Sequence, residues 1–251
     1  MKRKFKYLLS CGCSWMQGYG VEGKLKHRLS NIISDKYELE NINISEGGAS
    51  NEFTLRKITE WLSNNRDKAK ETFILIGLTE STRYEYWLEN QKQYSKGHPG
   101  SVPHITWEEH RKFAEFHLLN VGMDMPQLWK TYQIIIQLKS ISKYFGSEIL
   151  IFESLGGFNK QMLKFNKELD NSVDNWFRQT SFSDMDIDFI FDKNYYGETS
   201  WEDALGGQYN QHEKDDFNVK YYNHENNDGH PNKLGNEFWS KKIIEHMEKK
   251  F

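Results

Sequence analysis

The hydrophobic and polar positions of this chain follow two rhythms, one typical of buried strands and one typical of amphipathic helices. Residues 72–78 form a continuous apolar run, as expected of a central parallel strand that is covered on both faces. Leu25, Leu29, Ile32 and Ile33 instead recur at helical spacing, which predicts a helix with one apolar face. The alternation of such strands and helices predicts an α/β fold with a central parallel sheet.

The same criteria locate the remaining elements of this sheet and its helices. Strands are predicted at residues 5–12, 39–45, 72–78 and 147–152. Helices are predicted at residues 22–37, 51–70, 107–119, 126–145 and 234–250. Asn51 is expected to cap the second of these helices. We expect residues 1–251 to form a single domain.

Two segments show no sustained period and are expected to be inserted loops, at about residues 80–105 and 156–227. Long irregular segments in compact enzymes are often lids or substrate-binding structure. Both segments are rich in aromatic residues, and the second can equally be a surface for a partner.

Composition changes this picture mainly by excluding classes of function. Lys+Arg 33 against Asp+Glu 36 gives a net charge of -3, so no global field favours nucleic acid or an anionic membrane. No window approaches the roughly 18 uninterrupted apolar residues of a membrane span. The apolar part of the N-terminal segment is far shorter than a secretion signal needs. We therefore expect a soluble cytoplasmic protein.

The two cysteines and the aromatic content add two further expectations. Cys11 and Cys13 are too close along a strand for a strain-free disulfide, which agrees with a reducing compartment. The aromatic fraction of 15% is high against a hydrophobic fraction of 37%, which favours aromatic clefts. Such clefts commonly bind sugars or bases.

The first predicted strand ends in the tight turn Gly12-Cys13-Ser14, and Gly18 follows four residues after the serine. A serine just beyond a strand has an exposed hydroxyl, and its own N–H can face a developing oxyanion. Cys13 should point the opposite way, into the core, so Ser14 is the expected nucleophile. The alternative is an ordinary turn that contains a serine.

A base for this serine is available near the other end of the chain. Asp228 and His230 lie two positions apart, just before the last predicted helix, which Pro231 is expected to begin. The carboxylate can orient the imidazole, which then accepts the serine proton. The alternative is a turn with an exposed histidine. A metal site built from Cys11, Cys13, His224 and His230 lacks the Cys-x-x-Cys spacing of zinc sites, so no metal is expected.

Together these motifs resemble the SGNH/GDSL hydrolases, a family of serine esterases and acyl-ester lipases. The family's Gly-Asp-Ser-x-x-x-Gly block is similar to residues 12–18, with Cys13 in place of the aspartate. Its second block resembles residues 43–48, and its last block resembles Asp228 and His230. The resemblance implies a flavodoxin-like three-layer fold with a central parallel sheet and no cofactor. It covers the two ends of the chain, so the irregular insert expected before the last helix lies outside it.

The family's third block, Gly-x-Asn-Asp, is replaced here by residues 77–80, Gly-Leu-Thr-Glu. The asparagine of that block donates a hydrogen bond to the oxyanion. The resemblance therefore implies an oxyanion hole of the Ser14 and Gly48 N–H groups, with Thr79 or Asn51 in place of the asparagine. The spacing Asp-x-His, shorter than the family's usual Asp-x-x-His, occurs in relatives that act on polysaccharide acyl groups.

The sequence and the resemblance predict a serine-dependent ester hydrolase that removes a small acyl group, such as acetyl, from a carbohydrate or another small molecule. Trp15 and Arg83 are the expected substrate-binding residues. Arg83 can bind a substrate carboxylate or can pair with Glu85 on the surface. Two alternatives remain open: an O-acyltransferase with the same triad, and a non-catalytic binding or structural module that keeps the fold. The sequence leaves the natural substrate and the oligomeric state open.

Overall fold

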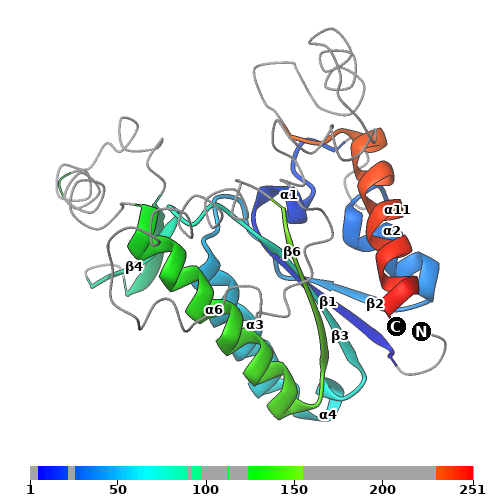
Figure 1. Ribbon diagram of the computed structural model, residues 1–251, viewed down its shortest axis with the longest axis horizontal. Helices are drawn as coiled ribbons and strands as arrows, with labels where there is room; N and C mark the ends of the chain where they lie inside the picture. Colours follow the sequence, from blue (N-terminus) through cyan, green and yellow to red (C-terminus); the bar gives the residue numbers. More distant parts are fainter. Residues whose placement is uncertain are drawn as a thin grey trace, which may run out of the picture.

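A computed structural model of the chain describes residues 5–21, 26–89, 92–97, 112, 124–154 and 230–250. Its centre is a four-stranded sheet with the order β2-β1-β3-β6 (Figure 1). All three neighbouring pairs of strands in this sheet are parallel. The strands are β1 (Tyr7–Cys11), β2 (Glu40–Asn43), β3 (Thr72–Leu78) and β6 (Glu148–Glu153). The predicted parallel sheet is confirmed.

Helices cover both faces of the sheet, which gives three layers (Figure 1). One face packs against α3 (Asn51–Asn64) and α6 (Asp124–Phe145), and the other against α2 (Leu29–Tyr37) and α11 (Lys233–Lys250). The alternation of side chains along the strands explains this arrangement, because successive residues point to opposite faces. On β1, Leu9 joins the core under α3 and α6, whereas Leu8 joins the core under α2 and α11.

Each of the two cores combines strand residues with the apolar stripe of its helices. The core under α3 and α6 includes Leu9, Ile74, Ile76, Ile58, Leu62, Ile135 and Leu138. The core under α2 and α11 includes Leu8, Phe73, Leu75, Phe152, Ile33, Trp239 and Ile243. Burial of this surface is the main force that holds the helices against the sheet.

Several predicted helix ends differ from the observed ones. The helix expected at residues 51–70 is divided into α3 and α4 (Arg66–Ala69) at Asn65. Its cap is Ser50 and not Asn51, because the Ser50 hydroxyl accepts a 3.2 Å hydrogen bond from the Phe53 N–H. Pro231 does not begin the last helix. That helix begins at Lys233, and the Asn232 side chain accepts a hydrogen bond from the Gly235 N–H as an N-cap residue does.

The expectation of an irregular loop after β3 is wrong in part. Residues Tyr84–Leu88 form β4 and residues Gln93–Gly97 form β5, which pair as an antiparallel hairpin. Aromatic residues on both strands favour this structure, and Trp87 lies opposite Tyr94 across the hairpin. Each strand has five residues, which is too short for a clear alternation of apolar and polar positions.

Other predictions lie outside the described residues. These are the helix at residues 107–119, except position 112, the insert at residues 156–227, and Asp228. The single-domain organisation also stays a prediction. Among the helices that the structure describes, none has the length and apolar character needed to cross a membrane.

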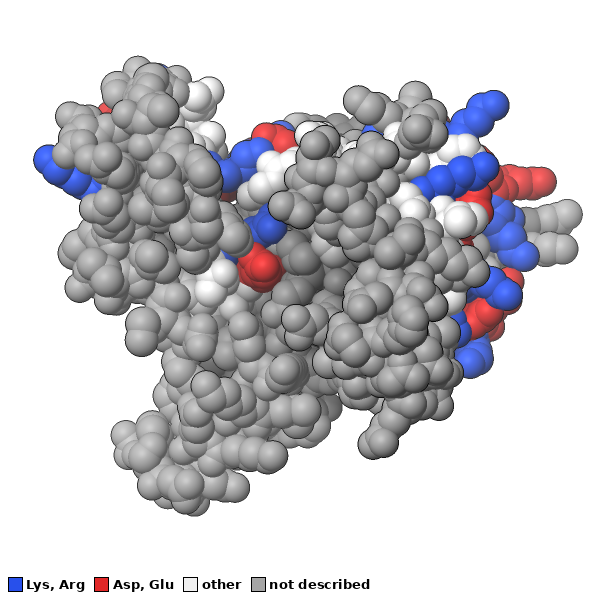
Figure 2. Space-filling view, turned by 90° about the horizontal axis from the view of Figure 1, so that it is seen from above, with Lys and Arg blue, Asp and Glu red and all other residues white. Residues whose placement is uncertain are grey.

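The surface that the described residues form carries charges of both signs. Figure 2 shows blue and red side chains interspersed on its right-hand side, where α2 and α11 lie in Figure 1. Lys36 pairs with Glu248 between these two helices at 3.6 Å, and Lys233 pairs with Glu237 along α11 at 3.9 Å. This side of the molecule therefore has a mixed charge, in agreement with the near-neutral composition.

Candidate active site

Ser14 and His230 lie in contact, although 216 positions separate them in the chain. The Nε2 atom of His230 is 2.9 Å from the Oγ atom of Ser14. Ser14 is the first residue of α1 (Ser14–Gln17), which Gly12 and Cys13 connect to β1. His230 lies shortly before α11, which begins at Lys233. A hydroxyl at this distance can transfer its proton to a neutral imidazole. The expected proximity of these two residues is thus observed.

Two aromatic rings lie beside the imidazole of His230. Its ring centroid is 6.0 Å from that of Trp15 and 5.0 Å from that of Tyr19. Tyr19 is 60% exposed, so its ring borders solvent beside the histidine. Trp15 was predicted from the sequence as a substrate-binding residue, whereas Tyr19 was not. The only signal for Tyr19 was its position directly after Gly18, where α1 ends in a left-handed residue.

The turn that contains Gly47 and Gly48 lies beside the serine. A Cβ atom placed on Gly47 would be 4.0 Å from the Cβ of Ser14. Gly48 has a φ of 71°, a left-handed conformation that favours glycine. Among the hydrogen bonds between described residues, none uses the N–H of Ser14 or of Gly48. At the end of the sheet that carries the serine there are therefore two backbone donors without a partner in the described part of the chain.

Asn43 connects this turn to the short helix that carries the serine. Its side-chain amide donates hydrogen bonds to the Met16 carbonyl at 2.8 Å and to the Ser30 hydroxyl at 2.9 Å. Its side-chain oxygen accepts a 3.0 Å hydrogen bond from the Ser45 N–H. These bonds fix the end of β2 relative to α1, which places the glycine turn and Ser14 on one rigid support.

Thr79 lies directly after β3, and its backbone is held by Asn51. The Asn51 amide donates to the Thr79 carbonyl at 3.0 Å, and its oxygen accepts from the Thr79 N–H at 3.0 Å. The same amide nitrogen also lies 3.5 Å from the hydroxyl of Thr131. Asn51 is buried with its amide engaged in this way, which argues against its expected role as an oxyanion donor. We assign it a positioning role instead.

The hydroxyl of Thr79 differs from the Asn51 amide in its hydrogen bonding. Thr79 is buried, and its Oγ1 atom has no hydrogen-bond partner among the residues that the structure describes. A buried hydroxyl without a partner destabilises the fold, so such a group usually has a ligand or a function. Thr79 therefore remains a candidate donor in the position of the family's asparagine.

Arg83 does not pair with Glu85, which was the alternative to a substrate-binding role. It pairs with Glu80 at 3.3 Å, and its side chain is only 13% exposed. Glu85 pairs instead with Arg56, through bonds of 2.6 and 3.0 Å. These hydrogen bonds raise the pKa of the Arg56 guanidinium. The substrate-binding role of Arg83 stays a proposal.

Both cysteines are buried and free. Cys13 is fully buried, as predicted, in the N-cap position of α1. Burial raises the pKa of the Cys11 thiol to about 12, so this group stays protonated at neutral pH. Within the described residues, no three His, Cys, Asp or Glu side chains gather as metal ligands would.

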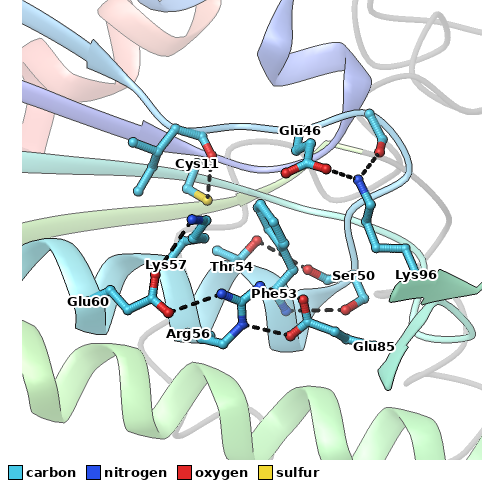
Figure 3. A network of polar contacts seen from close by, with 12 residues as sticks. Cys11, Glu46, Ser50, Phe53, Thr54, Arg56, Lys57, Glu60, Glu85 and Lys96 are labelled. Atoms are coloured by element: carbon cyan, nitrogen blue, oxygen red, sulfur yellow. Dashed lines mark hydrogen bonds and ion pairs between the residues drawn. The ribbon is translucent and has the colours of Figure 1, made fainter. Parts of the chain in front are cut away.

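The β4–β5 hairpin is fixed to the glycine turn and to α3 by a network of polar contacts (Figure 3). From β5, Lys96 pairs with Glu46 and donates a 2.8 Å hydrogen bond to the carbonyl of Gly47. From β4, Glu85 forms its two hydrogen bonds to Arg56 on α3. The hairpin is thus anchored beside the candidate site on two sides.

Comparison with known proteins supports the fold. No protein-family model matches the sequence, and no curated protein matches it. Among solved structures, the chain is similar to a lipolytic protein of the G-D-S-L family from Veillonella parvula, with a TM-score of 0.51 and 13% identity over 96% of this chain and 97% of that chain.

Two further solved structures have lower TM-scores. The psychrotrophic esterase EstA from Pseudoalteromonas sp., inhibited by monoethylphosphonate, has a TM-score of 0.47 and 13% identity over 97% of each chain. TesA has a TM-score of 0.49 and 9% identity over 95% of this chain and 96% of that chain. We base the fold assignment on the match to the Veillonella protein. The chain has the three-layer α/β fold of the SGNH/GDSL lipolytic proteins, as the resemblance predicted.

Proposed function

We propose that the chain is a serine esterase, in which Ser14 is the nucleophile and His230 is the general base. The observation that carries this proposal is the 2.9 Å contact between the Ser14 hydroxyl and the His230 imidazole. A non-catalytic module has no need for this contact, which favours an enzyme over that alternative. Asp228 lies two positions before His230 and completes the proposed triad, because its carboxylate can orient the imidazole.

The proposed reaction has two steps. The Ser14 Oγ attacks the ester carbonyl while His230 accepts its proton, and His230 then donates that proton to the leaving alcohol. Water, activated by the same histidine, hydrolyses the acyl-enzyme and restores the serine. If a sugar hydroxyl takes the place of water, the same residues transfer the acyl group to the sugar.

The negative charge that develops on the carbonyl oxygen needs donors in place before the reaction. The N–H groups of Ser14 and Gly48, which have no partner within the described ranges, are the first two candidates. The hydroxyl of Thr79, buried and without a partner, is the third. Three donors left unsatisfied by the fold at one edge of the sheet support an oxyanion hole there.

We further propose that the substrate is a small acyl ester, such as an acetyl ester of a carbohydrate. Trp15 and the exposed ring of Tyr19 lie beside His230, where they can contact the alcohol part of an ester. Aromatic rings offer an apolar face that packs against sugar rings. Arg83 lies after Thr79 and is proposed to contact polar groups of the substrate.

Hydrolysis of p-nitrophenyl acetate, butyrate and octanoate by the purified chain tests the proposed activity. The wild type should hydrolyse acetate fastest, and Ser14→Ala should lower kcat by about 10³-fold or more. Ser45→Ala is the matched control, because it removes another serine hydroxyl, one that has no hydrogen-bond partner among the described residues. It should stay within about threefold of the wild type. Wild-type activity at the buffer rate, or full activity of Ser14→Ala, would contradict the proposal.

The proposed preference for carbohydrate esters can be tested separately with the same purified protein. Acetate release from peracetylated mono- and oligosaccharides should have a higher kcat/KM than release from ethyl acetate. Addition of an unacetylated sugar during turnover should reveal whether the acyl group goes to water or to a hydroxyl. Equal rates on both classes of ester would contradict the carbohydrate proposal and leave the esterase intact.

A further inference from the structure

A lysine side chain lies on the peptide group that supplies one of the proposed oxyanion donors. The ammonium group of Lys96 donates a 2.8 Å hydrogen bond to the carbonyl oxygen of Gly47. This carbonyl and the N–H of Gly48 belong to the same planar peptide unit. A cation held on one end of this unit therefore acts on the donor at its other end.

The position of this peptide gives the contact its importance. Gly47 is next to Ser14, with a distance of 4.0 Å between a Cβ placed on Gly47 and the Cβ of the serine. Gly48 takes up a left-handed conformation, and its N–H has no partner among the described residues. A turn built from two glycines has the greatest freedom to rotate, so an external contact is needed to fix the peptide plane.

The surroundings of Lys96 hold its ammonium group in place. Its side chain is 26% exposed, pairs with Glu46, and lies 5.7 Å from the ring of Phe53 (Figure 3). Its backbone belongs to β5, where Lys96 lies opposite Glu85, and Glu85 is bonded to Arg56 on α3. The lysine therefore reaches the glycine turn from a strand that is itself anchored.

A charged donor on a carbonyl has two effects on the peptide. A charge-assisted hydrogen bond is about twice as strong as a neutral one, so it restricts rotation of the peptide plane. It also withdraws electron density through the conjugated unit and polarises the N–H, because linked hydrogen bonds strengthen one another. Both effects favour donation to a negatively charged oxygen more than donation to a neutral carbonyl.

We propose that Lys96 is a positioning residue of the oxyanion hole, which acts through the Gly47–Gly48 peptide. This inference rests on the proposed esterase function. The β4–β5 hairpin then has a role in catalysis, because it delivers the ammonium group to the turn. Lys96 touches neither the substrate nor the reacting atoms, so its effect should appear in kcat and not in KM.

Kinetics of Lys96→Met with p-nitrophenyl acetate test the inference. Loss of a whole oxyanion donor costs about 10²–10³-fold in kcat, and loss of its support should cost about 10-fold, with KM changed less than twofold. Lys96→Arg keeps the charge and the donors and should recover most of this loss. Lys92→Met is the matched control, since Lys92 lies on the same hairpin but pairs only locally with Glu89. It should match the wild type.

A second variant separates this role from simple anchoring of the hairpin. Glu46→Gln removes the ion pair of Lys96 but leaves its hydrogen bond to the Gly47 carbonyl. If Lys96 acts through the peptide, Glu46→Gln should retain kcat within about threefold of the wild type. An equal loss in Glu46→Gln and Lys96→Met would overturn the inference and assign the lysine to anchoring alone.

A measurement that does not depend on turnover completes the test. The ¹³C shift of the Gly47 carbonyl and the ¹H shift of the Gly48 amide should both change in Lys96→Met and stay the same in Lys92→Met. Unchanged shifts, or unchanged kcat in an active enzyme, would overturn this inference alone. A wild type without esterase activity would refute the proposed function and, with it, the catalytic role of Lys96, whatever the shifts show.

Discussion

The imidazole Nε2 of His230 lies 2.9 Å from the hydroxyl of Ser14, which joins the two ends of the chain at one edge of the sheet. Hydrogen bonds to the residues that follow the histidine hold it in this position. Asn236, buried in α11, donates hydrogen bonds to the carbonyls of Pro231 and Asn232 at 3.2 and 3.0 Å. The segment that carries the histidine is thereby fixed to the helix that packs on the sheet.

This contact predicts that His230→Ala loses most of the esterase activity. General base catalysis typically contributes about 10²–10⁴-fold, so kcat for p-nitrophenyl acetate should fall by that order. Added imidazole should restore part of the rate, because the deleted ring leaves room beside Ser14. His246→Gln, a change within α11 and away from the serine, is the control. Unchanged kcat in His230→Ala would show that another group is the base.

Thr79→Val should separate activity from stability. Valine has the shape of threonine without the hydroxyl, and the Thr79 hydroxyl is buried without a partner. The free energy of unfolding should therefore stay the same or rise by about 1 kcal/mol. If the hydroxyl donates to the oxyanion, kcat should fall by about 10-fold to 10²-fold. Urea unfolding and steady-state kinetics on the same preparation check both, and an unchanged kcat would remove Thr79 from the oxyanion hole.

Asn51→Ala should mainly lower the stability of the fold. The substitution leaves both the N–H and the carbonyl of Thr79 without their 3.0 Å partners in a buried site. The free energy of unfolding should fall by about 2–3 kcal/mol, as measured by urea denaturation. Activity should also fall, because Thr79 is no longer held in place. Part of this loss should be recovered at low temperature, where a larger fraction of the variant is folded. A loss of kcat at full stability would instead make Asn51 a direct oxyanion donor.

The two thiols should be unreactive in the folded protein. Burial raises the pKa of Cys11 to about 12, and Cys13 is fully buried. Neither thiol should react quickly with Ellman's reagent at pH 8, whereas both should react in guanidinium chloride. Fast labelling of a thiol with loss of activity would contradict the assignment of Ser14 as nucleophile.

The raised pKa of Cys11 also predicts a dependence of stability on pH. The unfolded thiol ionises near its ordinary value of 9.0, while the folded thiol stays protonated up to about pH 12. Stability is therefore fully present below pH 9 and declines as the pH rises from there toward 12. The free energy of unfolding, measured by urea denaturation, should therefore fall less between pH 9 and 10 in Cys11→Ala than in the wild type.

The parts of the fold that the sequence predicts best are those with strong local patterns. The apolar run at residues 72–78 coincides with β3, and helical spacing located α3 and α6 to within a few residues. The hairpin β4–β5 was missed because its strands have five residues each and pack on α3 through contacts such as Arg56–Glu85. Such contacts join residues 29 positions apart, so no local pattern reveals them.

The residues of the candidate site also differ in whether a local pattern predicts them. Ser14 and His230 were predicted because each stands in a short motif whose residue types are tied to a reaction. The positions of Asn51 and Lys96 depend instead on partners 28 and 49 residues away in the chain. A lysine in a hairpin and an asparagine at a helix start carry no signal of these roles. The tertiary structure alone brings them to the glycine turn and to Thr79.

Ser14, activated by His230, is proposed to form a covalent bond with the acyl group of its substrate. The most direct measurement is reaction with a fluorophosphonate probe, followed by mass spectrometry of the digested protein. The wild type should gain one phosphonyl group on the peptide that contains Ser14, Ser14→Ala should gain none, and His230→Ala should react far more slowly. An unlabelled wild type, or a label on any other residue, would contradict the claim.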